Sequence, residues 1–196
     1  MEYRLNKEDL FKSLATWNVF LKRKVHLIAC GGTAMTLLGV KESTRDVDFL
    51  VPVDEEYRYL IKTLEQLGYV SASGHGWQRK SEHYIFDLFR GKSVFTTELL
   101  DSPMDEGRHK LIKEFTHLYI GVLNHYDLII SKLFRCTSID VEDCLMLLRL
   151  RSSEISVDVL RERFKETAKY DITEEKMISN WNHFERALVK EGLYGK

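Results

Sequence analysis

Two aspartates separated by a single residue form the most informative feature of the chain. Asp46 and Asp48 alternate with Val47, Phe49 and Val51. Successive side chains of an extended strand point to opposite faces, so the two carboxylates share one face and the apolar residues share the other. Adjacent carboxylates repel each other and are costly to desolvate, which a divalent cation between them offsets. Oxygen ligands of this kind suit Mg²⁺ or Mn²⁺, which also bind water and substrate phosphates.

A third acid follows in a later apolar segment. Asp87 is the only charged residue between Tyr84 and Phe89. An unpaired carboxylate in such a run is costly, and a two-metal site for phosphoryl transfer needs carboxylates that bridge its ions. We therefore expect Asp87 to complete the metal site of Asp46 and Asp48. We also expect it to act as a base that takes the proton of the hydroxyl group accepting the transferred phosphoryl unit. The alternative is an aspartate on an edge strand that faces solvent.

A glycine turn precedes the aspartate pair. Gly31 and Gly32 let the backbone approach a triphosphate closely, and the first N–H groups of the following helix face such a ligand. Thr33 adds a hydroxyl group to this predicted phosphate-binding turn. The alternative is a tight turn that needs glycine for a positive φ. Arg45 either contacts a phosphate or pairs with a nearby acid such as Asp48.

A cationic helix face occurs later in the chain. Lys132 and Arg135 lie three residues apart in a predicted helix over residues 124–135, so they share one face beside apolar neighbours. An aromatic residue, Trp77, is the candidate for stacking on a nucleobase, whereas Trp17 and Trp181 are expected in the core or an interface.

The order of these residues resembles the signature of the polymerase-β-like nucleotidyltransferase superfamily, in which a hydrophobic residue and a Gly-Gly or Gly-Ser pair precede Asp-hydrophobic-Asp-hydrophobic. The matching residues are Cys30, Gly31, Gly32, Asp46, Val47, Asp48 and Phe49. Within the superfamily, Gly31 to Ala34 and Ser43 to Asp48 are similar to the minimal prokaryotic branch that contains the AbiEii-like toxins.

The resemblance implies an enzyme that uses Mg²⁺ or Mn²⁺ to move an NMP unit from an NTP to an acceptor hydroxyl. It implies a phosphate contact for Lys132, because Asp127, Leu128 and Lys132 match an Asp-Leu-x-x-x-Lys helix of the AbiEii-like proteins. Asp143 would orient the acceptor or Lys132, or would simply be a first-turn acid that the helix dipole favours, and Asp140 is best explained as an acid near the helix N-cap.

The sequence is compatible with several acceptors of the NMP unit. The resemblance to toxins favours tRNA or a protein, with an antitoxin as a further partner. A small molecule such as an antibiotic is the second enzymatic alternative. A module that binds nucleotides or a partner without turnover is the alternative from another functional class.

Composition limits these functions. The 196 residues carry a net charge of −1, so no global field attracts nucleic acid, and tRNA would need a local basic patch. The densest such region contains Arg149, Arg151, Arg161, Arg163 and Lys165. Three cysteines without close spacing argue against disulfides, and seven histidines form no zinc-binding motif. The start of the chain lacks a signal-peptide pattern and no apolar run approaches membrane-spanning length, so we expect a cytoplasmic protein without membrane contacts.

Periodicity predicts an α+β fold, with a mixed β-sheet and flanking helices followed by a C-terminal helical part. The resemblance implies that this sheet is of the nucleotidyltransferase type. The core is expected over residues 1–122 and the helical region, packed on the core, over residues 123–196. In the core, we predict helices at 7–22, 33–38 and 54–67, the last capped by Asp54, and strands at 25–30, 46–51, 69–72, 77–80, 82–89 and 118–122. Residues 91–116 are predicted to be an irregular flap, and the later helices to span 124–135, 139–151, 157–170 and 173–191.

Overall fold

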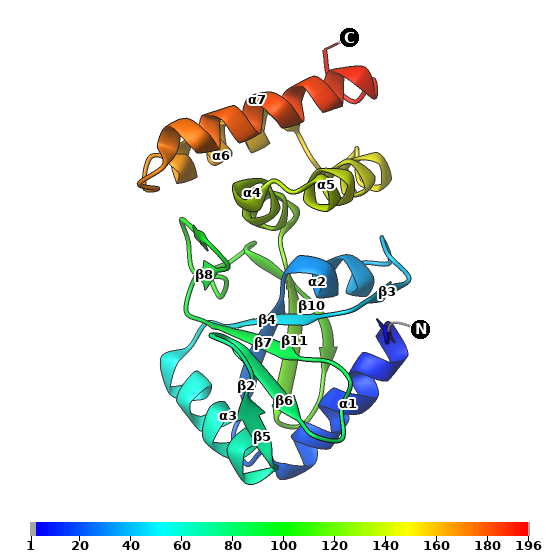
Figure 1. Cartoon of the computed structure of the whole chain (residues 1–196), viewed down its shortest axis with the longest axis vertical. Helices are drawn as coiled ribbons and strands as arrows, with labels where there is room; N and C mark the ends of the chain where they lie inside the picture. Colours follow the sequence, from blue (N-terminus) through cyan, green and yellow to red (C-terminus); the bar gives the residue numbers. More distant parts are fainter. Residues whose placement is uncertain (1–2, 196) are drawn as a thin grey trace.

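A mixed β-sheet forms the centre of the computed structural model, which describes residues 3–195 (Figure 1). Within that range the sheet has seven strands, in the order β10 (His109–Glu114), β11 (Leu118–Leu123), β2 (Val25–Ala29), β4 (Val47–Val51), β7 (Phe86–Arg90), β6 (Gly76–Arg79) and β5 (Tyr69–Ser71). Strand β4 pairs antiparallel with β2 and parallel with β7. The predicted α+β class with a mixed sheet is confirmed.

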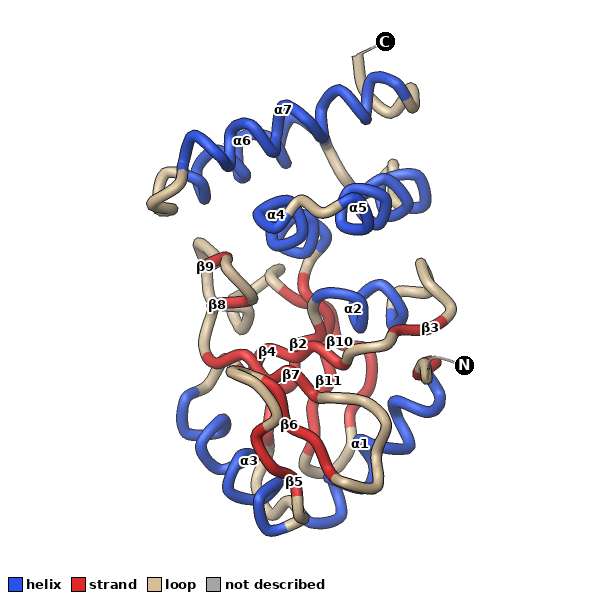
Figure 2. The backbone as a smooth tube through the Cα atoms, in the orientation of Figure 1, coloured by secondary structure: helices blue, strands red, loops and turns tan. Residues whose placement is uncertain are grey.

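Helices cover both faces and one end of this sheet. The described residues form α1 (Lys7–Phe20), α2 (Gly31–Leu37), α3 (Asp54–Gln66), α4 (His125–Arg135), α5 (Ser138–Leu150), α6 (Val157–Ala168) and α7 (Glu174–Lys190). Figure 1 shows α1 and α3 on one side of the sheet and α2 on the other, with α4 to α7 stacked beyond α2. Two short strand pairs, β1 (Leu5–Asn6) with β3 (Ser43–Thr44) and β8 (Ser93–Val94) with β9 (Thr97–Glu98), lie outside the main sheet (Figure 2).

Alternation along β4 and β7 divides their side chains between two environments. Phe49 and Phe86 are fully buried on the face that α1 covers, where the rings of Trp17 and Phe86 have centroids 4.3 Å apart. Asp48 and Asp87 point to the opposite face, which is the face of α2. The apolar face therefore anchors the two strands in the core, and the acidic face is left for a site.

The helices of the sheet half lie within two residues of their predicted boundaries, and their ends have identifiable caps. The side chain of Asn6 caps α1 by accepting from the backbone N–H of Asp9, and a left-handed Gly68 follows α3. The prediction that Asp54 caps α3 is wrong. Val53 is the N-cap residue of α3, and the Asp54 carboxylate instead pairs with Arg58 and Arg90.

The largest difference between the predicted and the observed secondary structure concerns residues 91–116. They include the hairpin of β8 and β9 and also β10, a regular edge strand of the main sheet, so the prediction of an irregular flap is wrong. Strand β10 has no clear alternation in the sequence, because it lies at an edge of the sheet and is mostly solvent-exposed. A register shift between Leu111 and Lys113 interrupts the alternation further. The predicted strand over 82–89 is also shorter, since β7 begins at Phe86.

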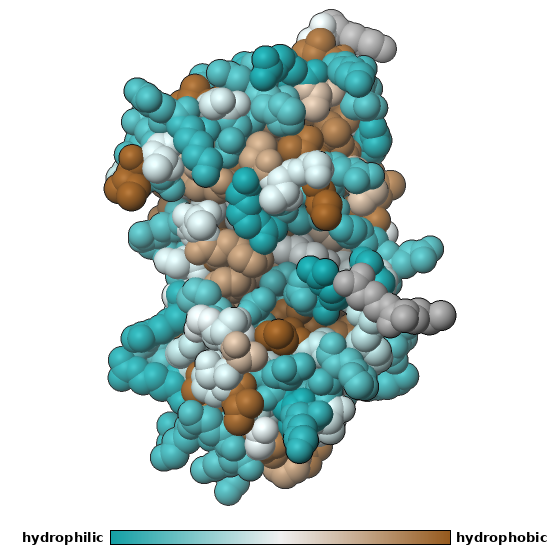
Figure 3. Space-filling model, viewed as in Figure 1, coloured by the Kyte–Doolittle hydropathy of each residue, from teal (hydrophilic) through white to brown (hydrophobic). Residues whose placement is uncertain are grey.

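Side-chain contacts connect the helices α4 to α7 with the sheet half of the chain. Lys41 Nζ lies 2.6 Å from an oxygen of Asp143 in α5, and Arg163 in α6 lies 2.9 Å from Asp101. Apolar side chains visible on the surface in Figure 3 occur as patches separated by hydrophilic side chains. Among the described residues, no helix has the length and apolar character needed to cross a membrane. The division at residues 122 and 123 stays a prediction.

Candidate functional site

Asp48 and Asp87 lie side by side on neighbouring strands. They are directly paired in the parallel register of β4 and β7, so their side chains leave the sheet on the same face. Asp48 is buried and Asp87 is partly buried. The alternative of a solvent-facing edge position does not apply to Asp87, because β7 lies between β4 and β6 in the interior of the sheet.

Asp46 lies just before β4, where two threonine hydroxyls fix its backbone. Thr33 Oγ1 and Thr44 Oγ1 both donate to the carbonyl oxygen of Asp46, at 3.2 and 2.8 Å. Thr33 Oγ1 also accepts from the backbone N–H of Asp48 at 2.9 Å. The Thr33 hydroxyl is buried and engaged with backbone groups, so its predicted place in a phosphate cradle is wrong. It positions the two aspartates instead.

The glycine turn packs directly against Asp48. Gly31 has a φ of +54°, and a Cβ atom there would lie 2.4 Å from Asp48 Oδ2. The backbone N–H of Gly32 donates to the same oxygen at 3.2 Å. Positive φ and close approach both require glycine at position 31, which matches the tight-turn alternative, while Gly32 remains in contact with the cavity described below.

Two carboxyl groups of the acidic face have raised pKa values. Burial raises the pKa of Asp48 to about 7, with a further increase from the charge of Asp87, whereas Arg135 and the Gly32 N–H act in the opposite direction. Burial and the charge of Asp46 also raise the pKa of Asp87. Carboxylates that hold their protons this strongly are stabilised in the ionised form by an added cation.

The raised pKa of Asp48 predicts a pH-dependent stability. Its folded pKa of about 7 exceeds the unfolded value of roughly 3.9, so the folded state binds the proton more tightly. Stability from this group is therefore complete below about pH 4 and is lost as the pH rises through about 7. Without divalent cations, Asp48→Asn should be more stable than wild type at pH 8, by up to about 4 kcal/mol, and the difference should vanish near pH 4.

Urea unfolding in EDTA at several pH values measures this difference. Glu142→Gln on an exposed surface of α5 removes one negative charge away from the pair and serves as the control. Equal pH profiles for Asp48→Asn and Glu142→Gln would contradict the prediction.

Lys132 lies in a buried ion-pair cluster. Its Nζ is 2.7 Å from Asp143 Oδ2 and 3.5 Å from Asp140 Oδ1, and all three side chains are at most 4% exposed. Asp143 also binds Lys41, and Asp140 binds Arg135 at 2.6 Å. Of the three alternatives for Asp143, orientation of Lys132 agrees with this geometry, and the first-turn acid is wrong, because Asp140 is the acid in the first turn of α5. Asp140 also completes a capping box with Thr137.

A polar cavity of about 490 Å³ joins these groups. Its lining residues are Arg4, Gly32, Lys41, Thr44, Arg45, Asp46, Asp48, Asp87, Phe95, Lys132, Arg135, Thr137, Ile139, Asp140 and Asp143. The acidic face of the sheet forms one wall, and the ends of α4 and α5 form the other. Of the predicted site residues, Asp46, Asp48, Asp87, Gly32, Arg45 and Lys132 share this cavity.

Several lining residues were not predicted. Lys41, Thr44 and Phe95 lie in loops or short strands without a periodic signal, and their role depends on tertiary contacts. Thr44 could have been found as a hydroxyl residue two positions before Asp46. Arg45 lies 3.4 Å from Asp46, so it pairs with that acid.

The donor chemistry of the acidic wall fits a divalent cation that is completed by substrate. Among residues 3–195, no group of three or more aspartate, glutamate, histidine or cysteine side chains is arranged to hold a metal ion. Mg²⁺, however, is commonly bound by one or two carboxylates, with water and substrate phosphates as the other ligands. The paired Asp48 and Asp87, with raised pKa values, meet that requirement.

Two predicted nucleic-acid contacts do not agree with the structure. Trp77 pairs across strands with Phe86, so its side chain lies on the face opposite Asp87 and packs against the core. The basic residues are each paired with acids, namely Arg149 with Glu191, Arg151 with Glu154, Arg161 with Asp158 and Glu185, Arg163 with Asp101 and Asp127, and Lys165 with Glu162. Their charges are therefore largely neutralised.

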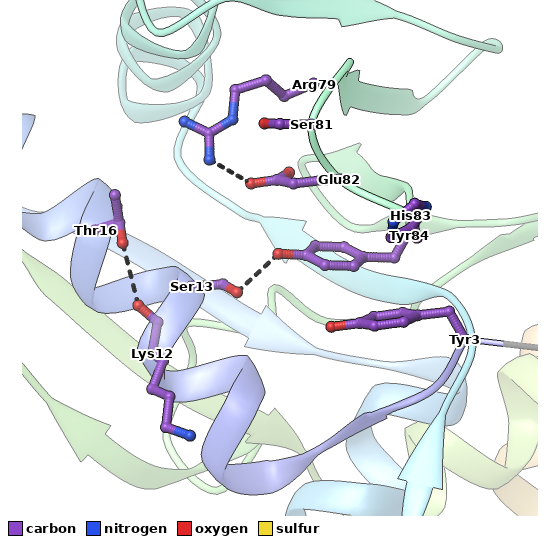
Figure 4. Close-up of a pocket in the computed structure, with 9 residues that line it drawn as sticks. All are labelled: Tyr3, Lys12, Ser13, Thr16, Arg79, Ser81, Glu82, His83 and Tyr84. Atoms are coloured by element: carbon purple, nitrogen blue, oxygen red, sulfur yellow. Dashed lines mark hydrogen bonds and ion pairs between the residues drawn. The ribbon is translucent and has the colours of Figure 1, made fainter.

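A second cavity of about 320 Å³ lies between α1 and the loop before β7. Figure 4 shows its lining side chains, with hydrogen bonds from Arg79 to Glu82 and between Ser13 and Tyr84. None of the predicted site residues lines this cavity.

The chain matches a known protein family, and its fold is similar to that of solved structures. A family model described as "Nucleotidyltransferase of unknown function (DUF6036)" matches residues 9–189. The fold is similar to that of ANT(2″)-Ia in complex with adenylyl-2″-tobramycin, with a TM-score of 0.54 and 17% identity over 80% of this chain and 95% of that chain. It is also similar to the lincosamide antibiotic adenylyltransferase LnuA bound to lincomycin, with a TM-score of 0.51 and 16% identity over 74% of this chain and 98% of that chain. No curated protein sequence matches the chain.

Proposed function

Because the chain belongs to the DUF6036 family of nucleotidyltransferases, we propose that it transfers an NMP unit from an NTP to a hydroxyl group of a small-molecule acceptor. The observation that carries this proposal is the register of β4 and β7, which pairs Asp48 with Asp87 in a cavity that also contains Asp46. The raised pKa values of Asp48 and Asp87 support binding of a cation at this wall.

Asp48 and Asp87 would hold Mg²⁺ or Mn²⁺, and Asp46 of the same cavity is proposed as a further ligand when substrate is bound. Bound there, the ion would neutralise charge on the phosphates and polarise the α-phosphate. The acceptor oxygen forms a bond to the α-phosphorus while the bond from that phosphorus to the bridging oxygen breaks, and pyrophosphate leaves with the electron pair. Asp87 is the proposed base that accepts the proton of the acceptor hydroxyl, because its partial exposure leaves it accessible and its raised pKa favours proton uptake.

The glycine turn and the cations have separate proposed roles. Gly32 lines the cavity and allows the phosphates to approach the start of α2, while Gly31 provides the turn that brings the backbone there. Arg45 is exposed next to Asp46 and is a proposed contact for the leaving pyrophosphate. Lys132 remains a charge of the cavity wall, with its ammonium group held by Asp143 and Asp140.

A small acceptor is favoured over RNA for two reasons. The cavity of about 490 Å³ has the volume of a site for small ligands. The basic residues expected to bind RNA are paired with carboxylates within the folded chain, which weakens their attraction for phosphates. The antibiotic acceptors named for ANT(2″)-Ia and LnuA make hydroxyl-bearing antibiotics a suitable first panel. The tRNA or protein acceptor, and the antitoxin partner, remain alternatives from the resemblance to AbiEii-like toxins.

Incubation with each α-³²P-labelled NTP and Mg²⁺ tests the proposal. We expect label in a small-molecule fraction when hydroxyl-bearing antibiotics or a low-molecular-mass cell extract are supplied, and release of pyrophosphate in equal amount. Label in RNA or protein would replace the small acceptor with a macromolecule. NTP binding without a labelled product under any of these conditions would support the non-catalytic module.

A further inference from the structure

The cations of the cavity differ in how far their charge is already neutralised. Lys132 is 3% exposed and contacts two carboxylates, and Lys41 binds Asp143 at 2.6 Å. Arg135 shares Asp140 with Lys132, and its side chain is 29% exposed on the cavity. Three cations thus face two carboxylates, which leaves one net positive charge on this wall. Arg135 is 29% exposed, Lys41 25% and Lys132 3%, so Arg135 and Lys41 present this charge to the cavity. The guanidinium group of Arg135 has five N–H donors, more than its contact with Asp140 uses, so it is the better placed of the two to bind a phosphate.

The guanidinium group of Arg135 is held in an unusual way. Its Cζ lies 3.8 Å from the centroid of the Phe95 ring, and one terminal nitrogen donates to Asp140 at 2.6 Å. Its Nε is buried and has no hydrogen-bond partner among the described residues. A ring face and a single carboxylate therefore fix the plane of the group.

Phe95 adopts a backbone conformation that bulky residues rarely occupy. Its φ is +52° in the turn between β8 and β9. Such strain persists only where the surroundings enforce it, and it is frequent at functional sites. Here the Phe95 ring contacts Arg135 on one side and meets the ring of Phe89 at an angle, with centroids 4.7 Å apart. Phe89 follows Asp87 by two residues on the same face of β7, so the stack begins next to the acidic wall.

We propose that Arg135 binds the nucleotide phosphates from the helix wall of this cavity, in addition to the contact proposed for Arg45, and that Phe95 is the positioning residue that holds the guanidinium group of Arg135 toward them. The proposal rests on the proposed nucleotidyl transfer, because it assigns the phosphate contact of that same site. It replaces Lys132, whose ammonium group is occupied by carboxylates. The charge of Arg135 also lowers the pKa of Asp48, which agrees with a position facing the acidic wall.

Calorimetric titration with ATP, GTP, CTP and UTP in Mg²⁺ tests the assignment. For the NTP that wild type binds best, Arg135→Met should weaken binding about tenfold or more, the loss expected for a charge-assisted contact. Its affinity should also depend less on salt than that of wild type, because one ionic contact is missing. Arg149→Met is the matched control, since Arg149 is an exposed arginine of α5 that pairs with Glu191 away from the cavity.

Variants of Phe95 separate positioning from general packing. Phe95→Leu keeps an apolar side chain but removes the ring face, so NTP binding should weaken, and Phe95→Tyr should restore it. Thermal unfolding of each variant establishes that it is folded, and Arg135→Lys replaces Arg135→Met if the latter does not fold. Arg135→Lys keeps the charge without the planar contact, so it should bind more weakly than wild type.

The results separate the phosphate contact assigned to Arg135 from the proposed nucleotidyl transfer. Absence of NTP binding by wild type would overturn both. Wild-type affinity in Arg135→Met or Arg135→Lys, or weaker binding with an unchanged salt dependence in Arg135→Met, would overturn the assignment alone. A larger loss of affinity in folded Lys132→Met than in Arg135→Met would return the phosphate contact to Lys132.

Discussion

Asp48→Asn should reduce nucleotidyl transfer by on the order of 10³-fold or more in kcat/KM while the protein stays folded. The asparagine keeps an oxygen that can accept from the Gly32 N–H, so the glycine turn should survive. It removes the negative charge that is paired in register with Asp87 on the acidic wall. Initial rates of pyrophosphate release, with the NTP and acceptor identified by labelling, measure the loss.

The loss of activity in Asp48→Asn should not come from unfolding. Because the carboxylate of Asp48 is costly in the absence of a cation, Asp48→Asn should be at least as stable as wild type at neutral pH. Glu142→Gln should retain wild-type rates, because Glu142 lies on an exposed face of α5 outside the cavity. Transfer by Asp48→Asn within a few fold of wild type would move the chemistry away from this pair.

Lys132→Met should destabilise the fold by about 3 kcal/mol, because removal of one partner leaves buried carboxylates with too little positive charge. Asp143 and Asp140 are both nearly inaccessible to water. Lys41 still contacts Asp143 and Arg135 still contacts Asp140, so the loss should fall at the lower end of the range for broken buried ion pairs. Urea unfolding at pH 7 measures the difference.

An exposed lysine provides the comparison. Lys165→Met removes a cation of α6 that pairs with Glu162 at the surface, and it should change stability by less than about 1 kcal/mol. In the double variant Lys132→Met/Asp143→Leu, the loss should be smaller than the sum of the single losses, because the two charges interact directly. A loss of less than about 1 kcal/mol in Lys132→Met would mean that its ammonium group reaches water.

Sequence patterns identified the acidic wall because their physical rules are local. Alternation along β4 and β7 depends only on strand geometry, and it put Asp48 and Asp87 on polar faces of otherwise apolar segments. Helical periodicity likewise located α1 and α4, and the side chains of Asn6 and Asn124 cap these helices by accepting from backbone N–H groups. The strand pairing that brings the two aspartates together had to come from the structure.

The remaining parts of the site depend on contacts between distant segments. Thr33 looked like a phosphate ligand because it follows two glycines, yet its hydroxyl turns toward the backbone of β4. Lys132 and Asp143 are 11 positions apart on different helices, so only the packing of α4 on α5 determines whether they meet. Phe95 follows no periodic pattern, and its place depends on a positive φ that sequence rules assign mainly to glycine.

Besides the acidic wall in the sheet interior and the wall of helix ends, the cavity is lined by Phe95 of the small β8–β9 hairpin, so parts of its lining differ in their opening free energies. Amide hydrogens of β4 are bonded between two neighbouring strands and should exchange with solvent only in global unfolding, whereas β8 and β9 pair through two residues each and should exchange through local opening. We therefore expect the carboxylates to stay fixed during turnover. Ligand entry and release would follow the faster fluctuations of the hairpin that carries Phe95.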